Sequence, residues 1–286
     1  MDLSIITVTW NAKENISEQI ESVFRGCKNI RCEEIISDNG SQDDTVEIAV
    51  GTGRDLSAPV QVIENGANIG FGSANNKGLK IAQGEFLLFL NPDMRVEEGS
   101  LDVIVEWMRQ HPDVGIVSPK LVDQFGKFNW DASPRRFPKV WEQVLLLLKV
   151  PHFVPTLLDR YLMKDFNPEL EQEVDSVRGS FMLVRRDLIK KLGWGFDPRY
   201  FFWFEDVDTC RECWKAGYKV MYTPIITAVD YVGQSFKKRK SYWKQKNFSK
   251  SMLTYFRKWE PWYKWMWIAV FRPVGMGVAF LVDLFR

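Results

Sequence analysis

The fold is decided by the stretch Glu85-Phe86-Leu87-Leu88-Phe89-Leu90-Asn91-Pro92-Asp93. Its apolar run, residues 86–90, is typical of a strand that is buried on both faces of a parallel sheet. The run stops at a polar turn, in which Pro92 fixes the backbone just before Asp93. Ligands bind at the carboxyl ends of strands in open α/β sheets, where a carboxylate can hold Mg²⁺ or Mn²⁺ against a diphosphate. The stretch therefore predicts an α/β fold with a ligand site at Asp93, although a plain Asn-Pro-Asp turn also fits.

Two earlier strands also end in polar side chains. Residues 3–9 predict a buried strand, which is followed by a turn and an amphipathic helix. Residues 34–37 predict a second strand that runs into an acidic loop at 38–45. In this loop Ser41 is placed to cap a helix over 43–50. Asp38, at the end of the strand, is placed to accept a hydrogen bond from a nucleotide base.

A loop rich in Gly and Asn, residues 65–78, follows a third expected strand at 60–64 and leads into a helix. Glycines let the backbone approach a ligand closely, and the start of a helix offers free N–H groups to a phosphate. Simple turn chemistry also explains most loops of this composition. Here the strand, loop, helix and next strand make one βαβ unit, so the loop and Asp93 are expected to lie side by side.

The second half of the chain is less regular. A helix at 101–109 and a strand at 114–118 precede a Pro-rich segment, residues 120–174, which contains one strongly apolar helix at 140–150. This helix fits an acceptor groove, a membrane contact or an ordinary core. A further strand at 176–184 contains Gly179, where a ligand could approach the backbone closely.

The most unusual stretch is Phe201-Phe202-Trp203-Phe204-Glu205-Asp206-Val207-Asp208 at the start of an expected helix. Acids at this position complement the helix dipole, and that alone accounts for many such clusters. Neighbouring aromatic rings, however, remove water from a carboxylate, which raises its pKa and suits it to general-base catalysis. Aromatic faces also stack on sugar rings. The stretch therefore favours a catalytic site.

The net charge of +1 hides a strong asymmetry between the two ends of the chain. Residues 236–286 carry twelve Lys and Arg against two acids, so this segment is +10 and the remainder −9. A basic, Trp-rich tail on an acidic globule favours a membrane surface over nucleic acid as the partner. No signal peptide is visible at Met1, so we expect the cytoplasmic face of the cell membrane.

The last part of the tail, residues 265–285, is apolar over roughly one bilayer thickness. Arg272-Pro273, Gly275 and Gly277 interrupt it, so we expect a helical hairpin that lies in the membrane interface and does not span it. The alternative is an oligomerisation arm, which would make the protein a homodimer.

Taken in order, these motifs resemble the inverting family 2 glycosyltransferases of the GT-A fold, and within them the bacterial rhamnosyltransferase branch. The resemblance rests on residues 5–11, 38–45, 68–72, 75–76, 91–93 and 205–208. It implies a mostly parallel sheet flanked by helices, with a nucleotide-sugar-binding half at 1–118 and an acceptor-binding half at 119–235. The basic helical tail, 236–286, matches nothing as sharply.

The resemblance also implies a role for each motif residue. The residues that would contact the donor are Thr7, Thr9, Asn11, Asp38, Asn39, Asn68, Gly70, Phe71, Asn75, Asn91 and Asp93. Asp206 stands at the position of the catalytic base, and its neighbour Glu205 is the alternative. The residues that would contact the acceptor are Arg178, Gly179, Trp203 and Asp208. The metal, Mg²⁺ or Mn²⁺, would be held by Asp93 and by Asp230, which stands where many relatives carry a His.

The implied reaction is the transfer of a sugar from a dTDP- or UDP-sugar to a hydroxyl of a lipid-linked or cell-surface glycan. Within this branch the best match is L-rhamnose from dTDP-L-rhamnose, transferred by a single displacement with inversion. Two other functions fit the same pattern. A non-catalytic relative would bind a nucleotide sugar or a glycan without reaction. A sugar nucleotidyltransferase would place a Gly-rich, basic loop after its first strand, where this chain has Trp10-Asn11-Ala12.

Overall fold

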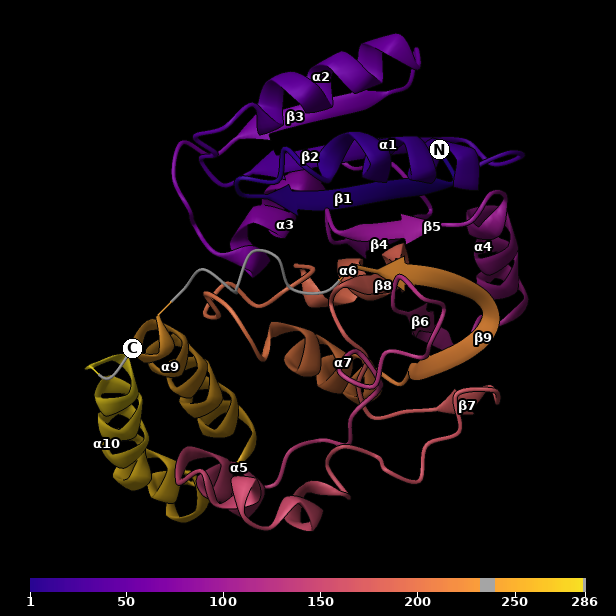
Figure 1. The fold of residues 1–286 in the computed structure, drawn as a ribbon. Helices are drawn as coiled ribbons and strands as arrows, with labels where there is room; N and C mark the ends of the chain where they lie inside the picture. The colour runs from indigo at the N-terminus through magenta and orange to yellow at the C-terminus, as the bar shows by residue number, and fades with distance from the viewer. Residues whose placement is uncertain (232–239, 285–286) are drawn as a thin grey trace.

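The computed structural model describes residues 1–231 and 240–284, and within them the chain forms one nine-stranded sheet flanked by helices (Figure 1). Eight of the nine strands follow one another across the sheet, and the ninth, β7 (Gln172–Glu173), pairs with β9 beside them. The order of the eight is β3 (Val60–Glu64), β2 (Cys32–Asp38), β1 (Leu3–Thr9), β4 (Phe86–Leu90), β8 (Phe181–Arg185), β6 (Val114–Val122), β9 (Lys219–Asp230) and β5 (Met94–Val96).

The first four strands are all parallel, as expected from the βαβ pattern. Their connecting helices are α1 (Ile16–Gly26), α2 (Thr45–Asp55) and α3 (Phe71–Leu79). Strand β4 is buried along its whole length. Phe86, Leu88 and Leu90 join the core on one face of the sheet, and Leu87 and Phe89 join the core on the other. The helices α1 and α4 (Ser100–Gln110) cover the first face.

The second half of the sheet is mixed. Strand β8 is antiparallel to both β4 and β6, whereas β6 and β9 are parallel. The strand expected at 176–184 is also shorter than predicted, because β8 begins only at Phe181. Helices α6 (Arg186–Leu192) and α7 (Glu205–Lys215) cover the second face, together with α3. The sheet was expected to be mostly parallel, and its parallel pairs are concentrated in the first half, with β6 and β9 the parallel pair of the second.

The helix after β2 differs from the prediction. It begins at Thr45 and runs to Asp55, and no side chain caps it. Ser41 does not act as the cap because its hydroxyl donates to Asp38 Oδ1. The backbone N–H of Thr45 instead donates to Asp43 Oδ1. The polarity of this loop therefore organises the loop itself.

The Pro-rich segment forms the short helix α5 (Val140–Leu147) and two 3-10 turns, η1 (Val150–His152) and η2 (Pro155–Leu158). Helix α5 packs against α10 (Trp262–Leu284), and α10 packs against α9 (Ser241–Trp259). A third core cluster joins these three helices to the residues that precede α7. It contains Val144 of α5, Phe204, Phe256 of α9 and Ile268 of α10.

The hairpin expected within residues 265–285 is not found, because residues 265–284 belong to the single helix α10, which packs against α9. Helix α9 is part of the globular core and not a separate appendage. Helix α10 continues without a break through Arg272 and Pro273, where we expected an interruption. Its length and composition would allow it to cross a membrane, and little of it is buried inside the protein. The basic residues 237–239 and the expected boundary between the acceptor-binding half and the tail, at 235–236, lie outside the part of the chain that the structure describes.

Candidate active site

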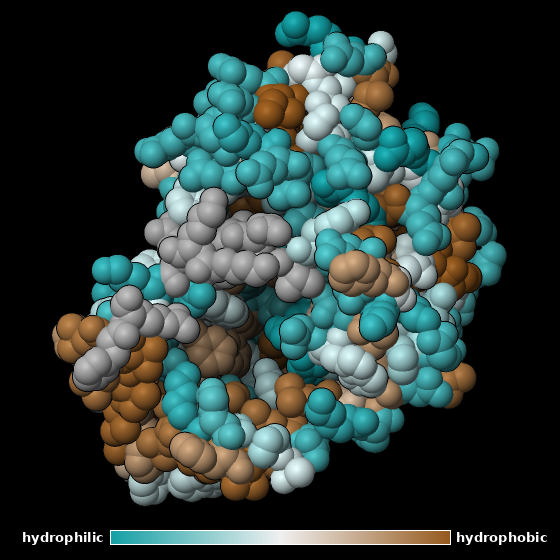
Figure 2. Space-filling model, in the orientation of Figure 1, coloured by the Kyte–Doolittle hydropathy of each residue, from teal (hydrophilic) through white to brown (hydrophobic). Residues whose placement is uncertain are grey.

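A cleft of about 350 Å³ opens beside the carboxyl ends of the parallel strands. Asp93, Asp206 and Asp230 all line it, although they are far apart in the sequence. Strand β4 leads to Asp93, β9 ends at Asp230, and Asp206 is the second residue of α7. Figure 2 shows the face of the molecule hollowed near its centre, beside the region where Figure 1 places α9 and α5. These three acids therefore lie in one cleft, as the roles implied by the resemblance require.

Asp93 and Asp230 are neighbours because β5 pairs with the end of β9. Met94, the residue after Asp93, lies opposite Asp230, and the backbone N–H of Tyr231 donates to the carbonyl of Asp93 at 3.0 Å. Asp230 also accepts a hydrogen bond from Asn129 at 3.3 Å. Two carboxylates on paired strand ends suit a hard cation such as Mg²⁺ or Mn²⁺. Within residues 1–231 and 240–284 no third acid, His or Cys completes a metal site, so donor oxygens would have to fill the remaining positions.

Asp206 is oriented by two backbone N–H groups. Val207 donates to its Oδ1 at 2.8 Å, and Gly179 donates to its Oδ2 at 3.2 Å. An ionised carboxylate has about four acceptor positions, so two remain for other donors. The start of α7 also favours negative charge at this position. Asp206 is therefore a fixed carboxylate that faces the cleft with room to accept a proton.

Glu205 also lines the cleft, but its surroundings differ. Burial raises its pKa well above the usual range, and the charge of Asp206 adds to this increase, whereas Arg178 opposes it. Its Oε2 has no hydrogen-bond partner among the described residues. The expected effect of the aromatic stretch on a carboxylate pKa is thus found at Glu205. Burial disfavours the charged form of Glu205, and two backbone N–H groups hold Asp206 in the cleft, so Asp206 is the better candidate for the base.

The turn before α7 is strained. Trp203 and Phe204 both have positive φ angles, 68° and 69°, a left-handed conformation that costs a residue with a side chain about 1 kcal/mol or more. Packing holds the turn in place, because the ring of Phe204 contacts those of Phe248 and Tyr255. Such strain is concentrated at functional sites. It fixes the position from which Glu205 and Asp206 project.

Several of the expected donor residues meet at the cleft. Asn39, Asn68, Phe71, Asn91 and Asp93 line it. Gly70 lies in the same loop and has a φ of 92°. A Cβ on this residue would lie 2.5 Å from the carbonyl oxygen of Phe201. Phe71 donates its backbone N–H to that oxygen at 2.9 Å. The loop rich in Gly and Asn therefore touches the aromatic turn, and only Gly fits at position 70.

Other expected donor residues do not reach the cleft. Thr7 and Thr9 are fully buried, and their hydroxyls donate to Glu34 and Asp38. Asn11 joins the turn after β1 to the loop at 41–42, and the buried Asn75 donates to the carbonyl of Phe71.

Asp38 is also unavailable to a nucleotide base in this structure. Its Oδ1 accepts from Thr9 and Ser41, and its Oδ2 accepts from the backbone N–H groups of Gly40 and Ser41. These four bonds fill the acceptor positions of the carboxylate. A contact between Asp38 and a base therefore stays a prediction, and it would need one of these bonds to be exchanged, whereas the neighbouring Asn39 lines the cleft.

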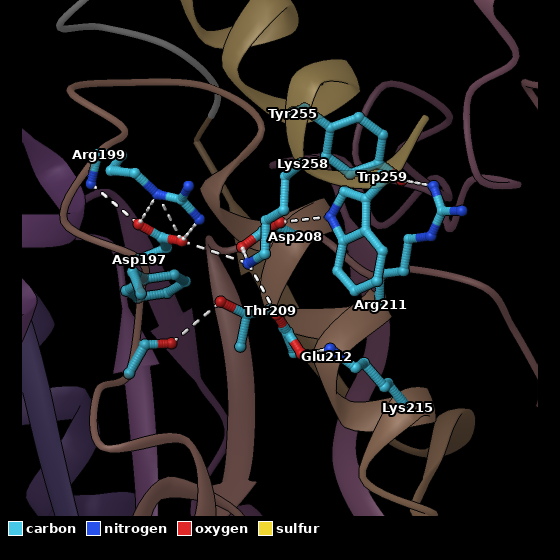
Figure 3. A network of polar contacts seen from close by, with 12 residues as sticks. Asp197, Arg199, Asp208, Thr209, Arg211, Glu212, Lys215, Tyr255, Lys258 and Trp259 are labelled. Carbon is cyan, nitrogen blue, oxygen red and sulfur yellow. Dashed lines mark hydrogen bonds and ion pairs between the residues drawn. The ribbon is translucent and has the colours of Figure 1, made fainter. Parts of the chain in front are cut away.

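Three of the four expected acceptor residues, Arg178, Gly179 and Trp203, line the cleft. Asp208 does not. Its side chain is fully buried beneath α9, where it accepts from Lys258 Nζ and Trp259 Nε1, each at 2.6 Å (Figure 3). Burial raises the pKa of Asp208, and the bond from Lys258 works in the opposite direction. The carboxylate is a structural anchor, so we no longer assign it an acceptor contact.

Some other cleft residues were not among the expected site residues. Asn129, Asp131 and Tyr161 come from the Pro-rich segment, and Trp243 and Phe248 come from α9. The aromatic pattern of the tail was interpreted as lipid-facing. Which side of α9 faces the cleft depends on how the helix packs, and the local sequence does not encode this.

Comparison with known proteins matches the motifs. The model of glycosyl transferase family 2 matches residues 4–193. An N-acetylglucosaminyl-diphospho-decaprenol L-rhamnosyltransferase from Mycobacterium tuberculosis is 29% identical over 204 residues, which cover 66% of this chain and 63% of the relative. Rhamnosyltransferase WbbL from Escherichia coli is 27% identical over 58% of this chain and 62% of its own. The chain thus spans less than two thirds of the length of these curated relatives.

The fold has the same support. The mannosyltransferase PcManGT from Pyrobaculum calidifontis, solved with GDP-Man and Mn²⁺, superposes with a TM-score of 0.61. It is 17% identical, and the match covers 98% of this chain and 73% of that one. This likeness confirms the expected GT-A fold, and the relatives agree with the rhamnosyltransferase branch indicated by the motifs.

Proposed function

This chain belongs to glycosyl transferase family 2, and we propose that it transfers L-rhamnose from dTDP-L-rhamnose to a hydroxyl group of a lipid-linked glycan. The observation that carries the proposal is the cleft that Asp206, Asp93 and Asp230 line together. The choice of sugar rests on the two matched rhamnosyltransferases, one of which is named for a diphospho-decaprenol acceptor.

In the proposed reaction Asp206 accepts the proton of the acceptor hydroxyl. The oxygen forms a bond to the anomeric carbon of the sugar, while the bond from that carbon to the donor phosphate breaks and the electron pair leaves with the diphosphate. The attack comes from the face opposite the diphosphate, so the configuration inverts. The backbone N–H groups of Val207 and Gly179 keep Asp206 aimed throughout.

Asp93 and Asp230 would hold the divalent cation. When bound, this cation supplies positive charge to the departing diphosphate. The donor would lie between the Gly and Asn loop and the end of β4, where Asn39, Asn68 and Asn91 line the cleft. Asn side chains donate and accept, so they can bind both phosphate and ribose oxygens.

A panel of nucleotide sugars tests the donor. We expect dTDP-L-rhamnose with Mn²⁺ to raise the thermal unfolding midpoint more than UDP- or GDP-sugars do, because at equal concentration the donor with the lowest Kd stabilises the folded state most. A ligand at a hundred times its Kd stabilises the folded state by about 2.7 kcal/mol. Release of dTDP would accompany transfer to an acceptor. Release of pyrophosphate would instead identify a nucleotidyltransferase, and donor binding without any turnover would identify a non-catalytic relative. Either result would contradict the proposal.

We also propose that α10 docks the protein on the cytoplasmic face of the cell membrane. Its outer side exposes Val270, Val274 and Val278, which are spaced four residues apart, and Figure 2 shows hydrophobic residues along this helix. Trp141, whose ring lies 5.6 Å from that of Trp267, and Phe153 extend the apolar surface onto the segment after α5. Lys and Arg in the tail suit anionic headgroups. The alternative partner for this surface is a second copy of the chain.

A further inference from the structure

Helix α9 forms one side of the cleft, although we expected it to belong to a separate tail. Trp243 and Phe248 of α9 line the cleft beside Trp203. The ring of Trp203 lies 6.3 Å from that of Trp243 and 5.9 Å from that of Phe248. We call these three side chains the aromatic wall. The amides expected to contact the donor come from elsewhere, from the segments that follow β2, β3 and β4.

The aromatic wall is joined to the residues that carry out the chemistry. Trp203 precedes Glu205 and Asp206 by only two and three residues. On the α9 side, the hydroxyl of Ser251 donates to the carbonyl of Phe202 at 2.7 Å. The ring of Phe248 also packs at 5.5 Å against that of Phe204. The wall and the base are therefore held by the same strained turn.

The C-terminal end of α9 is bound by ion pairs and hydrogen bonds to α7, the helix that carries the base. Lys258 lies within 2.6–3.2 Å of the carboxylates of Asp208, Glu212 and Asp197, and its side chain is largely buried (Figure 3). Trp259 donates to Asp208 from the same turn of α9. These contacts make the wall a preformed surface, because α9 cannot shift without breaking a buried charge cluster.

We propose that the aromatic wall binds the ring face of the acceptor's terminal sugar and so presents the acceptor hydroxyl to Asp206. This inference rests on the proposed function. One face of a pyranose carries C–H groups that pack on aromatic rings, while its hydroxyls bind carboxylates and amides at the edge. The cleft offers both, since Asp131, Glu205 and Asp206 line it together with the wall. An isoprenoid chain would have to lie beside these carboxylates, which disfavours it as the occupant.

Binding of simple sugars tests the inference without knowledge of the full acceptor. A panel of methyl pyranosides, including methyl N-acetylglucosaminide, is titrated into the full-length protein in the presence of dTDP and followed by saturation-transfer NMR. We expect at least one pyranoside to bind. Trp243→Ala should weaken it about tenfold, the usual effect of removing a central aromatic contact. Phe248→Leu, which keeps the apolar volume but loses the flat ring, should weaken it by a smaller factor.

Tyr242→Ala is the matched control. Tyr242 is the neighbouring residue on α9, but its ring packs against Phe280 of α10 and does not line the cleft. The control should bind the pyranoside as the unmodified chain does. The thermal unfolding midpoint of each variant shows whether it is folded, and Trp243→Phe replaces Trp243→Ala if the latter unfolds.

Three results would overturn the inference. No pyranoside binds to the unmodified protein, the Trp243 and Phe248 variants bind it unchanged, or these variants lose only a short isoprenyl phosphate added as a competing probe. Hydrolysis of dTDP-L-rhamnose, measured on the same samples, keeps the two proposals separate. If hydrolysis proceeds while pyranosides fail to bind, only the aromatic wall is wrong. If neither binding nor hydrolysis of the donor can be detected, the proposed function itself is wrong.

Discussion

Glu34 belongs to β2 and has no exposed surface, and its side chain contacts both β1 and α1. Its Oε1 accepts hydrogen bonds from Thr7 at 2.9 Å and from Gln19 at 2.8 Å. Burial raises its pKa to about 7, and these two bonds only partly offset the effect. Glu34 therefore holds its proton in the folded protein at pH values where the unfolded chain has already released it.

This shift makes stability depend on pH in a defined direction. Below about pH 4.5 both states are protonated, so the contribution of Glu34 is fully present, and it is lost as the pH rises to about 7. The loss amounts to about 3 kcal/mol, from 1.36 kcal/mol for each pKa unit. We expect Glu34→Gln to be more stable than the unmodified chain at pH 8 but not at pH 4.5. Urea unfolding at both pH values measures this, and an equal difference at both would contradict it.

Single residues also show where sequence reasoning succeeds and where it fails. Asp93 and Asp230 could be placed because each follows an apolar run, and strand order alone then brings them together. Thr7, Thr9 and Asp38 do not line the cleft, because each pairs with a polar partner that the sequence of one strand does not reveal. Thr7 has Glu34 and Gln19 as partners, and Asp38 has its own loop. Such pairings depend on neighbouring strands and can be seen only in three dimensions.

At the scale of elements, the docking of α9 depends on Lys258. The side chain of Asp208 has no exposed surface, and the ammonium group of Lys258 is its charged partner. Removing one partner of a buried ion pair costs about 3–5 kcal/mol, because the other charge is left without compensation. We expect Lys258→Met to lower the free energy of unfolding by about that amount, as measured by urea denaturation.

Lys264→Met is the control for this variant. Lys264 pairs with Glu260 at 2.8 Å, but about half of its side chain is exposed, so its loss should cost less than about 1 kcal/mol. Adding Asp208→Asn to Lys258→Met should recover part of the lost stability, since it removes the uncompensated charge. Equal effects of the two lysine variants would show that α9 is not held by this cluster.

The elements themselves could mostly be predicted. Apolar periodicity placed the strands and helices of the first half to within a few residues, since each is a buried run bounded by polar turns. The end of the chain was harder. The basic, aromatic composition of the tail predicted a helical segment but could not say that α9 shares a core with Phe204 and Val144. Pro273 was expected to interrupt α10, but the helix continues through it.

At the scale of the whole molecule, the outer side of α10 gives the protein one strongly apolar region. We expect the triple variant Val270→Glu, Val274→Glu and Val278→Glu to lose binding to vesicles that contain anionic lipid, because carboxylates on this side cannot enter the bilayer. Co-sedimentation measures the bound fraction.

A matched triple variant, Val50→Glu, Ile81→Glu and Val103→Glu, adds the same charge at similarly exposed apolar positions elsewhere. It should bind vesicles as the unmodified chain does. Equal loss in both triples would mean that net charge, and not α10, controls binding. A dimer of the unmodified chain that the α10 triple converts to a monomer, with vesicle binding unchanged, would assign this surface to a second copy of the chain.

The central claim is that Asp206 is the base of a sugar transfer from a nucleotide donor. Its most direct test is the rate of transfer by Asp206→Asn, with the affinity for the donor measured on the same protein and Glu205→Gln as the paired variant. We predict that Asp206→Asn keeps its affinity for dTDP-L-rhamnose, while turnover falls by about 10²–10⁴, the usual contribution of a general base, and lies well below that of Glu205→Gln. Turnover in Asp206→Asn within a fewfold of the unmodified enzyme would contradict the claim and move the base elsewhere.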